Sequence, residues 1–219
     1  MNRKTNKGEA DMVSPYSVHP GVAMVQKWVA TLKAKTGRSL EEWVVFVKAK
    51  GPPTEMERRA WLRGVHGLGT NSAWWIGERC DDRRTGHWDH NPESYLALAP
   101  VWVDKMFGGK KESLRPIYEQ LLTLGKSLGS DVRVCPCVTI VPLYRNKVFA
   151  QINPTTNKRV DLGFALGDTK PGGRLIDTGG FAKKDRITHR IGITHPNEID
   201  DEVLGWLRTA YDRDAGGAG

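Results

Sequence analysis

The chain has 219 residues, of which 39% are hydrophobic and 26% charged, and its 33 lysines and arginines against 25 acidic residues give a net charge of +8. This composition is typical of a globular protein and excludes a disordered, collagen-like or membrane-spanning chain, because no apolar run approaches the ~18 residues that cross a bilayer. The chain opens without a secretory signal pattern, and three cysteines do not indicate a disulfide framework, so we expect a cytoplasmic protein.

The hydrophobic pattern changes from helical to strand-like spacing along the chain. Four short segments with helical periodicity come first, and two of them open with capping boxes, Ser39 with Glu42 and Thr54 with Glu57. A charged stretch without periodicity follows, which indicates a linker. The expected division is a loose arm over residues 1–18, a helical module over 19–80, a linker over 81–92, an α+β domain over 93–215 and a frayed tail over 216–219.

The second domain begins with two helices and then turns to a period of two. The helices are expected over residues 93–107 and 114–128, and four or five strands follow. Residues 137–144 are apolar on both faces, as expected for a central strand. A last helix carries apolar positions over residues 199–211. This order predicts an α+β sandwich with a mainly antiparallel sheet, two helices before it and one after it.

Positive charge concentrates in the sheet region. Residues 131–190 hold 11 lysines and arginines against 5 acidic residues, whereas residues 198–214 hold 6 acidic residues against 2 basic ones. A basic sheet face with aromatic side chains is suited to following a phosphate backbone and stacking a base. The alternative is a solvated sheet face whose charges keep the protein soluble.

Two hypotheses use this region. In the first, the protein is a non-enzymatic binding protein whose basic sheet surface contacts nucleic acid or another polyanion. In the second, a polar pocket near His189 and the loop of residues 179–186 holds a small ligand or a substrate. A lone histidine on an apolar strand face is otherwise an ordinary core residue. The candidate contact residues are Tyr144, Arg145, Lys147, Phe149, Gln151, Arg159, Asp161, Lys183, Lys184, Arg186, His189 and Arg190.

A glycine turn, HGLGTN, joins two of the expected helices. Such a turn leaves backbone N–H groups free to hold a phosphate at the start of the next helix, and it resembles the turn of helix-hairpin-helix DNA-binding modules. The alternative is that the glycines only supply positive φ in a tight turn. The candidate phosphate-holding residues are Gly67, Gly69, Thr70 and Asn71.

The sequence predicts no metal site and no cofactor. Cys135 and Cys137 lack the two-residue gap of zinc sites, so we interpret them as small residues packed on a sheet. The linker cluster of His87, Asp89 and His90 has no supporting ligand. A nucleophile elbow, a P-loop, a dinucleotide fingerprint and a zinc-protease helix are all missing from the sequence, which favours a non-enzymatic protein.

The third hypothesis is that the chain is an interaction module that binds a partner protein. Its expected signature is exposure of Trp74, Trp75 and Trp88, because exposed aromatic side chains mark interfaces. The alternative is that these side chains pack within the helical module or at its seam with the second domain.

Long stretches of the sequence carry a family resemblance. The helical module resembles the domain of unknown function 4287 in TGRSLEEWVVFVKAKG and AWLRGVHGLG. The rest resembles the domain of unknown function 5655 in YLALAPVWVDKMFGGKKESLRPIYEQLLTLGKSLGSDVRVCPCVTIVPLYRNKVFAQI, RVDLGFALGD and LIDTGGFAKKDRITHRI. Together the two cover about residues 20–214. The resemblance implies a bacterial cytosolic protein with a helical and an α+β module, and it implies no catalytic residues.

Overall fold

The computed structural model describes residues 14–81 and 91–216. The chain forms two compact units, one of His19–Leu98 and one of Ala99–Gly219 together with the segment that ends at Val18. Each helix of the described residues is too short or too polar to span a bilayer.

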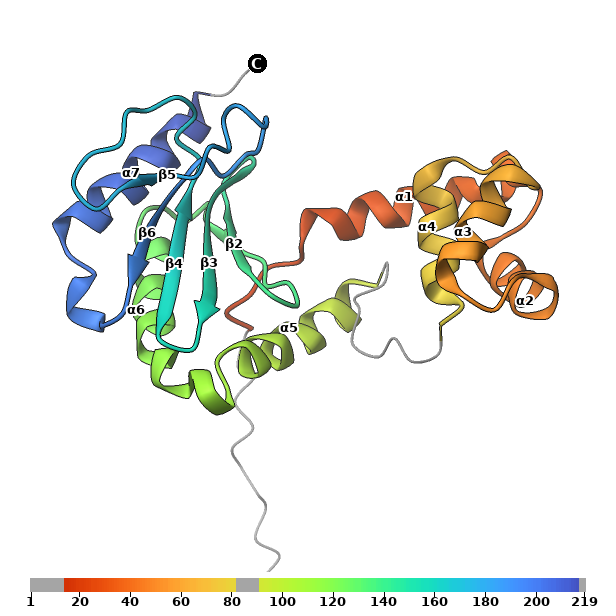
Figure 1. Ribbon diagram of the computed structural model, residues 1–219, viewed down its shortest axis with the longest axis horizontal. Helices are drawn as coiled ribbons and strands as arrows, with labels where there is room; N and C mark the ends of the chain where they lie inside the picture. The colour runs from red at the N-terminus through yellow and green to blue at the C-terminus, as the bar shows by residue number, and fades with distance from the viewer. Residues whose placement is uncertain (1–13, 82–90, 217–219) are drawn as a thin grey trace, which may run out of the picture. The chain divides into compact units, whose positions relative to one another are not determined.

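The helical unit contains the four short helices that the periodicity predicts. Both capping boxes are present, because the Ser39 and Thr54 side chains accept from the N–H groups of Glu42 and Glu57, whose carboxylates bond back. Helix α1 ends at Gly37, which has a φ of 79°. The helices are α1 (Pro20–Thr36), α2 (Leu40–Lys50), α3 (Glu55–Gly64) and α4 (Thr70–Arg79) (Figure 1).

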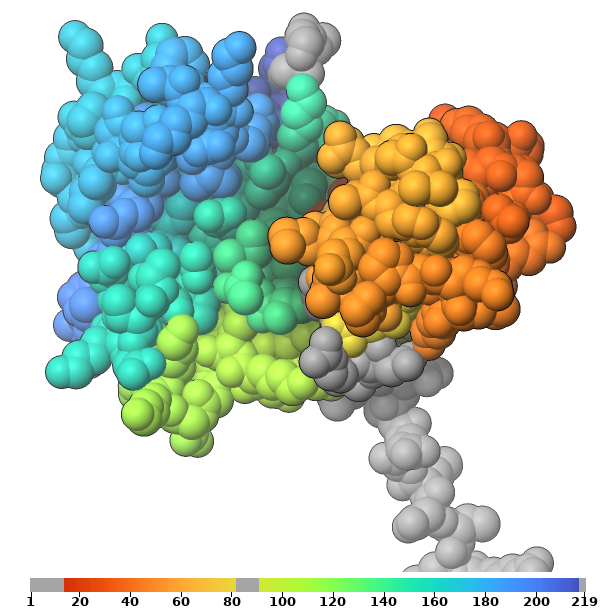
Figure 2. Space-filling model, turned by 45° about the vertical axis from the view of Figure 1, so that its right-hand side comes forward, coloured from red at the N-terminus to blue at the C-terminus, as the bar shows by residue number. Residues whose placement is uncertain are grey.

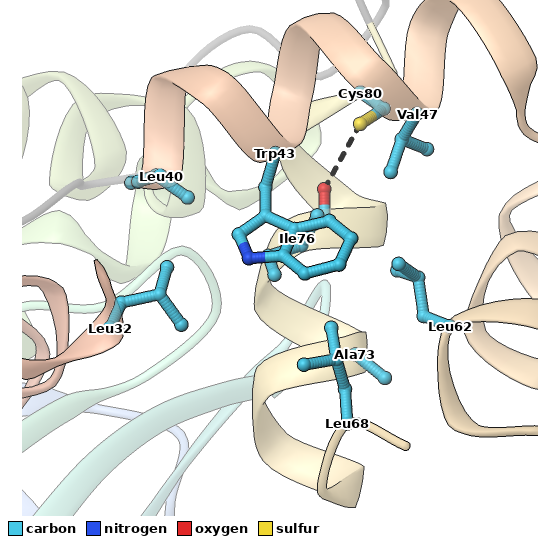
Figure 3. Close-up of a cluster of buried hydrophobic side chains, with 9 residues drawn as sticks. All are labelled: Leu32, Leu40, Trp43, Val47, Leu62, Leu68, Ala73, Ile76 and Cys80. Atoms are coloured by element: carbon cyan, nitrogen blue, oxygen red, sulfur yellow. Dashed lines mark hydrogen bonds between the residues drawn. The ribbon is translucent and has the colours of Figure 1, made fainter. Parts of the chain in front are cut away.

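Trp43 lies in the core of this unit, with only 2% of its surface exposed (Figure 3). Its indole N–H donates to the hydroxyl of Thr36 at 2.8 Å, so the large side chain is buried without an unsatisfied donor. The Cys80 thiol donates to the carbonyl of Ile76 at 3.2 Å. The surrounding buried side chains are Leu32, Leu40, Val47, Leu62, Leu68 and Ala73.

The second unit is the predicted α+β fold. It contains six antiparallel strands in the order β1-β2-β3-β4-β6-β5, whereas the sequence predicted four or five. Strand β5 has only two residues, too few for an alternating pattern to reveal it, and β2 begins only at Val141. The strands are β1 (Arg133–Val134), β2 (Val141–Tyr144), β3 (Val148–Thr156), β4 (Arg159–Phe164), β5 (Ile176–Asp177) and β6 (His189–Ile193).

Two helices cover one face of the sheet (Figure 1). Leu143 of β2 packs against α6, where a Cβ on Gly125 would lie 2.8 Å from its Cδ1. On β3, the ring of Phe149 contacts that of Tyr211 in α7, with centroids 5.6 Å apart. The two covering helices are α6 (Arg115–Lys126) and α7 (Asp201–Ala215). Helix α5 (Pro92–Met106) precedes them, and short 3-10 helices lie at Gly109–Leu114 and Pro196–Glu198.

Residues 16–18 of the N-terminal segment are held against the second unit. The N–H of Ser17 donates to the carbonyl of Val134 in the edge strand β1 at 2.8 Å, and the hydroxyls of Tyr16 and Tyr118 are 3.0 Å apart. The end of the segment that the sequence predicted to be loose is therefore docked on the α+β unit.

Candidate anion-binding surfaces

The turn between α3 and α4 is a tight hairpin that leaves the start of α4 uncapped. Gly67 has a φ of +64°, which glycine adopts without strain. Leu68 turns inward and donates its N–H to the carbonyl of Leu62 at 3.1 Å, and its side chain is buried. Gly69 is the N-cap of α4 and has no side chain to accept from the first N–H groups of the helix.

The hairpin borders a groove of about 620 Å³ in the helical unit. Lys35 and Arg38 are its basic lining residues, and none of the described residues that line it is acidic. The Arg38 guanidinium lies 4.9 Å and 4.3 Å from the ring centroids of Trp43 and Phe46. These cation–π contacts hold a positive charge in the groove that Gly69 also lines.

His66 lies on the wall of the same groove. Its ring is nearly perpendicular to the rings of Trp43, Phe46 and Trp61, at centroid distances of 5.5, 5.3 and 4.4 Å. Its Nε2 is buried and has no hydrogen-bond partner among the described residues. The sequence pattern predicts no separate role for His66, because its aromatic neighbours come from α2 and α3.

The structure brings the four predicted hairpin residues together. Gly67 and Gly69 line the groove, while Thr70 and Asn71 are exposed in the first turn of α4. Lys35 and Arg38 complete this surface, and they lie about thirty residues earlier in the sequence.

The arginines of the predicted basic sheet surface are paired with acidic residues. Arg145 pairs with Asp131 at 2.8 Å and stacks on the ring of Tyr211 at 4.0 Å. Arg186 pairs with Asp214 at 2.6 Å. The sheet region therefore presents fewer unpaired cations than its composition indicates.

The remaining sheet candidates divide between surface and core. The side chains of Lys147, Lys183 and Lys184 are exposed, and the loop that carries the last two lies on the surface of the α+β unit (Figure 2). Phe149 is fully buried against α7 and cannot stack on a base. Tyr144 is partly buried, which raises the pKa of its phenol.

His189 is a core residue. Its side chain is fully buried, with Nδ1 2.8 Å from the hydroxyl of Thr188 and Nε2 2.8 Å from the carbonyl of Thr169. Both ring nitrogens are thus engaged by groups of the protein itself.

A polar groove of about 520 Å³ lies on the α+β unit at the strands β3, β4 and β6. Its floor has two cross-strand rows, because Gln151, Gly163 and Arg190 are paired in register, as are Asn153, Asp161 and Gly192. A Cβ on Gly163 would lie 2.7 Å from Cγ2 of Ile187, so glycine is needed where the loop before β6 crosses the sheet. The sequence-predicted residues that line this groove are Gln151, Asp161, Arg186, His189 and Arg190.

The described cysteines are buried or partly buried, whereas the two described tryptophans of the partner-protein hypothesis differ in exposure. Burial raises the pKa of the Cys135 thiol to about 12 and that of Cys137 to about 11, and both thiols are free.

Trp75 packs edge-on against Trp28 at 4.7 Å, while Trp74 is 40% exposed. The cluster of His87, Asp89 and His90 lies outside the described residues, as does Trp88.

Potential metal ligands do not gather within residues 14–81 and 91–216. No group of three or more histidine, cysteine, aspartate or glutamate side chains there is placed to hold an ion.

Two family models match the chain, one on each unit. The model described as domain of unknown function (DUF4287) matches residues 24–76, and the model described as domain of unknown function (DUF5655) matches residues 103–214. Comparison with curated proteins and with solved structures gives no match. The α+β unit accounts for the longer match, which spans half of the sequence, and the chain therefore belongs to the DUF5655 family.

Proposed function

We propose that this chain is a non-enzymatic nucleic-acid-binding protein that holds the phosphate backbone at the start of α4. The observation that carries the proposal is the uncapped Gly69 N-terminus of α4, which borders the same groove as Lys35 and Arg38. Free backbone N–H groups and the helix dipole favour an anion at this end of a helix, and two cations strengthen that preference.

The hairpin geometry supports a phosphate rather than a bulky ligand. Gly67 and Gly69 carry no side chain, and a Cβ at either position would have no atom within 4 Å. A phosphate group can therefore approach the backbone directly. Arg63 and Val65 are also exposed near the hairpin, so a long polyanion has room to continue past it.

The three cysteines support a reducing compartment for this function. They are free thiols, and cytoplasmic proteins keep their cysteines in this form. We propose the cytoplasm as the location.

Substitutions of Gly69 test the proposal, because they separate binding from stability. The backbone of Gly69 (φ −62°, ψ 156°) suits any residue, so no strain enters. Gly69→Ala keeps the N–H groups free, Gly69→Asn caps them without charge, and Gly69→Asp caps them with a carboxylate. Asn and Asp are better N-caps than Gly, and Ala is worse.

Across the three Gly69 variants, stability and affinity for nucleic acid should rank in opposite orders. Stability should rise from Ala to Asp, whereas affinity for a labelled DNA duplex or single strand should fall, by about tenfold or more for Gly69→Asp. Fluorescence anisotropy should also show binding weakening about 10- to 40-fold between about 50 and 200 mM salt, as two or three phosphate contacts require. Equal affinity for Gly69→Asp and Gly69→Ala, or no binding at low salt, would overturn the proposal.

Lys35→Gln provides a side-chain test with a matched control. Lys35 lines the groove, whereas Lys50 is an exposed lysine at the end of α2 outside it. Both substitutions remove one positive charge, so a general charge effect would weaken binding equally. The proposal requires a larger loss for Lys35→Gln than for Lys50→Gln.

A further inference from the structure

A buried carboxylate, Asp161, holds two arginines on the sheet: Arg190 lines the groove, and Arg159 lies beside it on the same carboxylate. Oδ1 of Asp161 lies 2.8 Å from Nε of Arg159 and 3.0 Å from Nη1 of Arg190. Its Oδ2 accepts from the hydroxyl of Thr155 at 2.9 Å. The Asp161 side chain is 10% exposed, against 38% and 31% for the two arginines, so the acid lies beneath them.

This arrangement leaves positive charge unbalanced. Two guanidinium groups share one carboxylate, which gives these three side chains a net charge of +1. Asp185 also lines the groove, but it is exposed and has no ion pair with either arginine among the described residues. Each guanidinium has five N–H donors, and the carboxylate engages only some of them. Nε of Arg159 is buried and within ion-pair distance of Asp161, yet it has no hydrogen-bond partner of acceptable geometry among the described residues. The cluster thus has spare donors as well as spare charge.

Two amide side chains lie beside this cluster. Asn153 is the cross-strand partner of Asp161, and Gln151 is in the same row as Arg190 with only Gly163 between them. Both amides line the groove. An amide side chain offers a donor and an acceptor together, which suits a polar ring or another amide.

We propose that this groove binds a small organic anion that carries one phosphate or carboxylate group. The anionic group lies on the guanidinium groups of Arg159 and Arg190, which Asp161 holds in place. The polar remainder of the molecule bonds to the amides of Gln151 and Asn153.

The dimensions and the charge both favour this ligand class. The volume of about 520 Å³ lies within the range of about 300–1,000 Å³ that is typical of small-molecule sites. Arginine held by a carboxylate is already oriented, so less side-chain entropy is lost when an oxyanion binds. The inference is independent of the proposed nucleic-acid function, because the hairpin and this groove are on different units.

Calorimetric titration of the full chain tests the inference with four probes: inorganic phosphate, glycerol phosphate, AMP and lactate. AMP or glycerol phosphate binding more tightly than inorganic phosphate would support a phosphate ester, and tightest binding of lactate would support a carboxylate. The absence of binding by all four probes at millimolar concentration would overturn the inference.

Variants then locate the binding. Arg190→Gln removes one guanidinium while Asp161 keeps Arg159, and binding should weaken about tenfold or more; Lys158→Gln, an exposed neighbour outside the groove, should leave it unchanged. Gln151→Ala should weaken the binding of AMP more than the binding of inorganic phosphate. Thermal unfolding of each variant checks the fold, and a folded Arg190→Gln that binds as well as the original chain would overturn the inference.

A cross-test separates this groove from the hairpin. Gly69→Asp should leave small-anion binding unchanged, and Arg190→Gln should leave DNA binding unchanged. Loss of small-anion binding in Gly69→Asp would place that binding at the hairpin and overturn the inference, whereas failure of DNA binding alone would overturn only the proposed function.

Discussion

The carboxylate of Asp214, near the end of α7, pairs with the guanidinium of Arg186 in the loop before β6 at 2.6 Å. The same carboxylate accepts from the backbone N–H groups of Asn146 and Lys147 at 2.7 and 2.9 Å. Only 2% of the Asp214 side chain is exposed. One buried acid therefore joins the last helix, the β2–β3 turn and the loop that crosses the sheet.

Asp214→Ala should destabilise the α+β unit strongly. The substitution removes the buried carboxylate that accepts from two backbone N–H groups, and a hydrogen bond to a charged group contributes about 1.5–3 kcal/mol. Arg186→Gln should cost less, because Arg186 is 44% exposed and the two backbone bonds remain. Urea unfolding of the two variants measures the difference, and an equal loss in both would show that the backbone bonds contribute little.

Replacing Lys184 with glycine should stabilise the fold, whereas replacing Lys183 with glycine should not. It is the one non-glycine residue with positive φ in the described part of the chain, at 60°. It closes a turn in which Lys184 and Asp185 donate back to Phe181 and Gly180, the pattern of a helix end that favours glycine.

We expect Lys184→Gly to be more stable than Lys183→Gly by about 1–2 kcal/mol. Both variants lose one lysine, so charge cannot account for a difference. Equal midpoints of thermal unfolding would contradict the turn geometry.

The ion pairs of Arg174 should make the free energy of unfolding fall when the solution becomes acidic. Its guanidinium bonds to Glu202 at 2.7 Å and to Asp200, and these bonds, with backbone N–H groups, hold the carboxyl groups in their charged form. For Glu202 the Arg174 bond is the main cause of a pKa below the ordinary 4.5, and for Asp200 the Val203 N–H is the main cause of a pKa below 3.8.

A carboxyl group with a lowered pKa stabilises the fold above its ordinary pKa, and this contribution is lost as pH falls through the lowered value. Stability should therefore fall as pH drops below about 4.5. Arg174→Met should reduce this fall, whereas Arg208→Met, at an exposed position of α7, should not. Urea unfolding from pH 7 to pH 3 gives the comparison, and identical pH profiles for the two variants would contradict it.

The two free cysteines next to the edge strand β1, Cys135 and Cys137, should react slowly with alkylating reagents. A thiol reacts as the thiolate, and burial raises the pKa of Cys135 to about 12 and of Cys137 to about 11. At pH 8 the folded chain should react with iodoacetamide roughly a hundredfold or more slowly than the chain in urea. Trypsin releases both residues in one peptide, after Arg133 and after Arg145, so mass spectrometry can follow them together. Fast labelling in the folded state would show that these thiols are accessible.

Local signals predict much of the helical part of the fold. The two capping boxes and the apolar periodicity place the helices, and the change to a period of two identifies the α+β unit. The bounds of the strands follow less well. Strand β5 is too short to show a pattern, and residues 137–140 are apolar without forming a strand.

The direction of Phe149 shows why alternation alone misplaces a side chain. The register between β2 and β3 shifts next to Tyr144, which pairs with Val148 instead of Phe149. A shift of this kind interrupts the alternation of faces. Phe149 is therefore buried against α7, although strict alternation would place it on the same face as Gln151.

The charge of the sheet region could not be judged from composition, because the partners are distant in sequence. Asp214 was counted with the acidic last helix, yet it neutralises Arg186, 28 residues before it. A sequence signal does exist for Asp214, since it follows Val203, Leu207 and Ala210 on the buried face of α7. An acidic residue at such a position is expected to have a buried partner.

The central claim is that the start of α4 holds the phosphate backbone, and amide chemical shifts test it most directly. In a titration of the isotope-labelled chain with a short DNA duplex at low salt, the account predicts the largest shift changes at the amides of Gly67, Gly69, Thr70 and Asn71. These changes should disappear at high salt. Shift changes confined to the loop of Lys183 and Lys184, with the hairpin amides unmoved, would contradict the account.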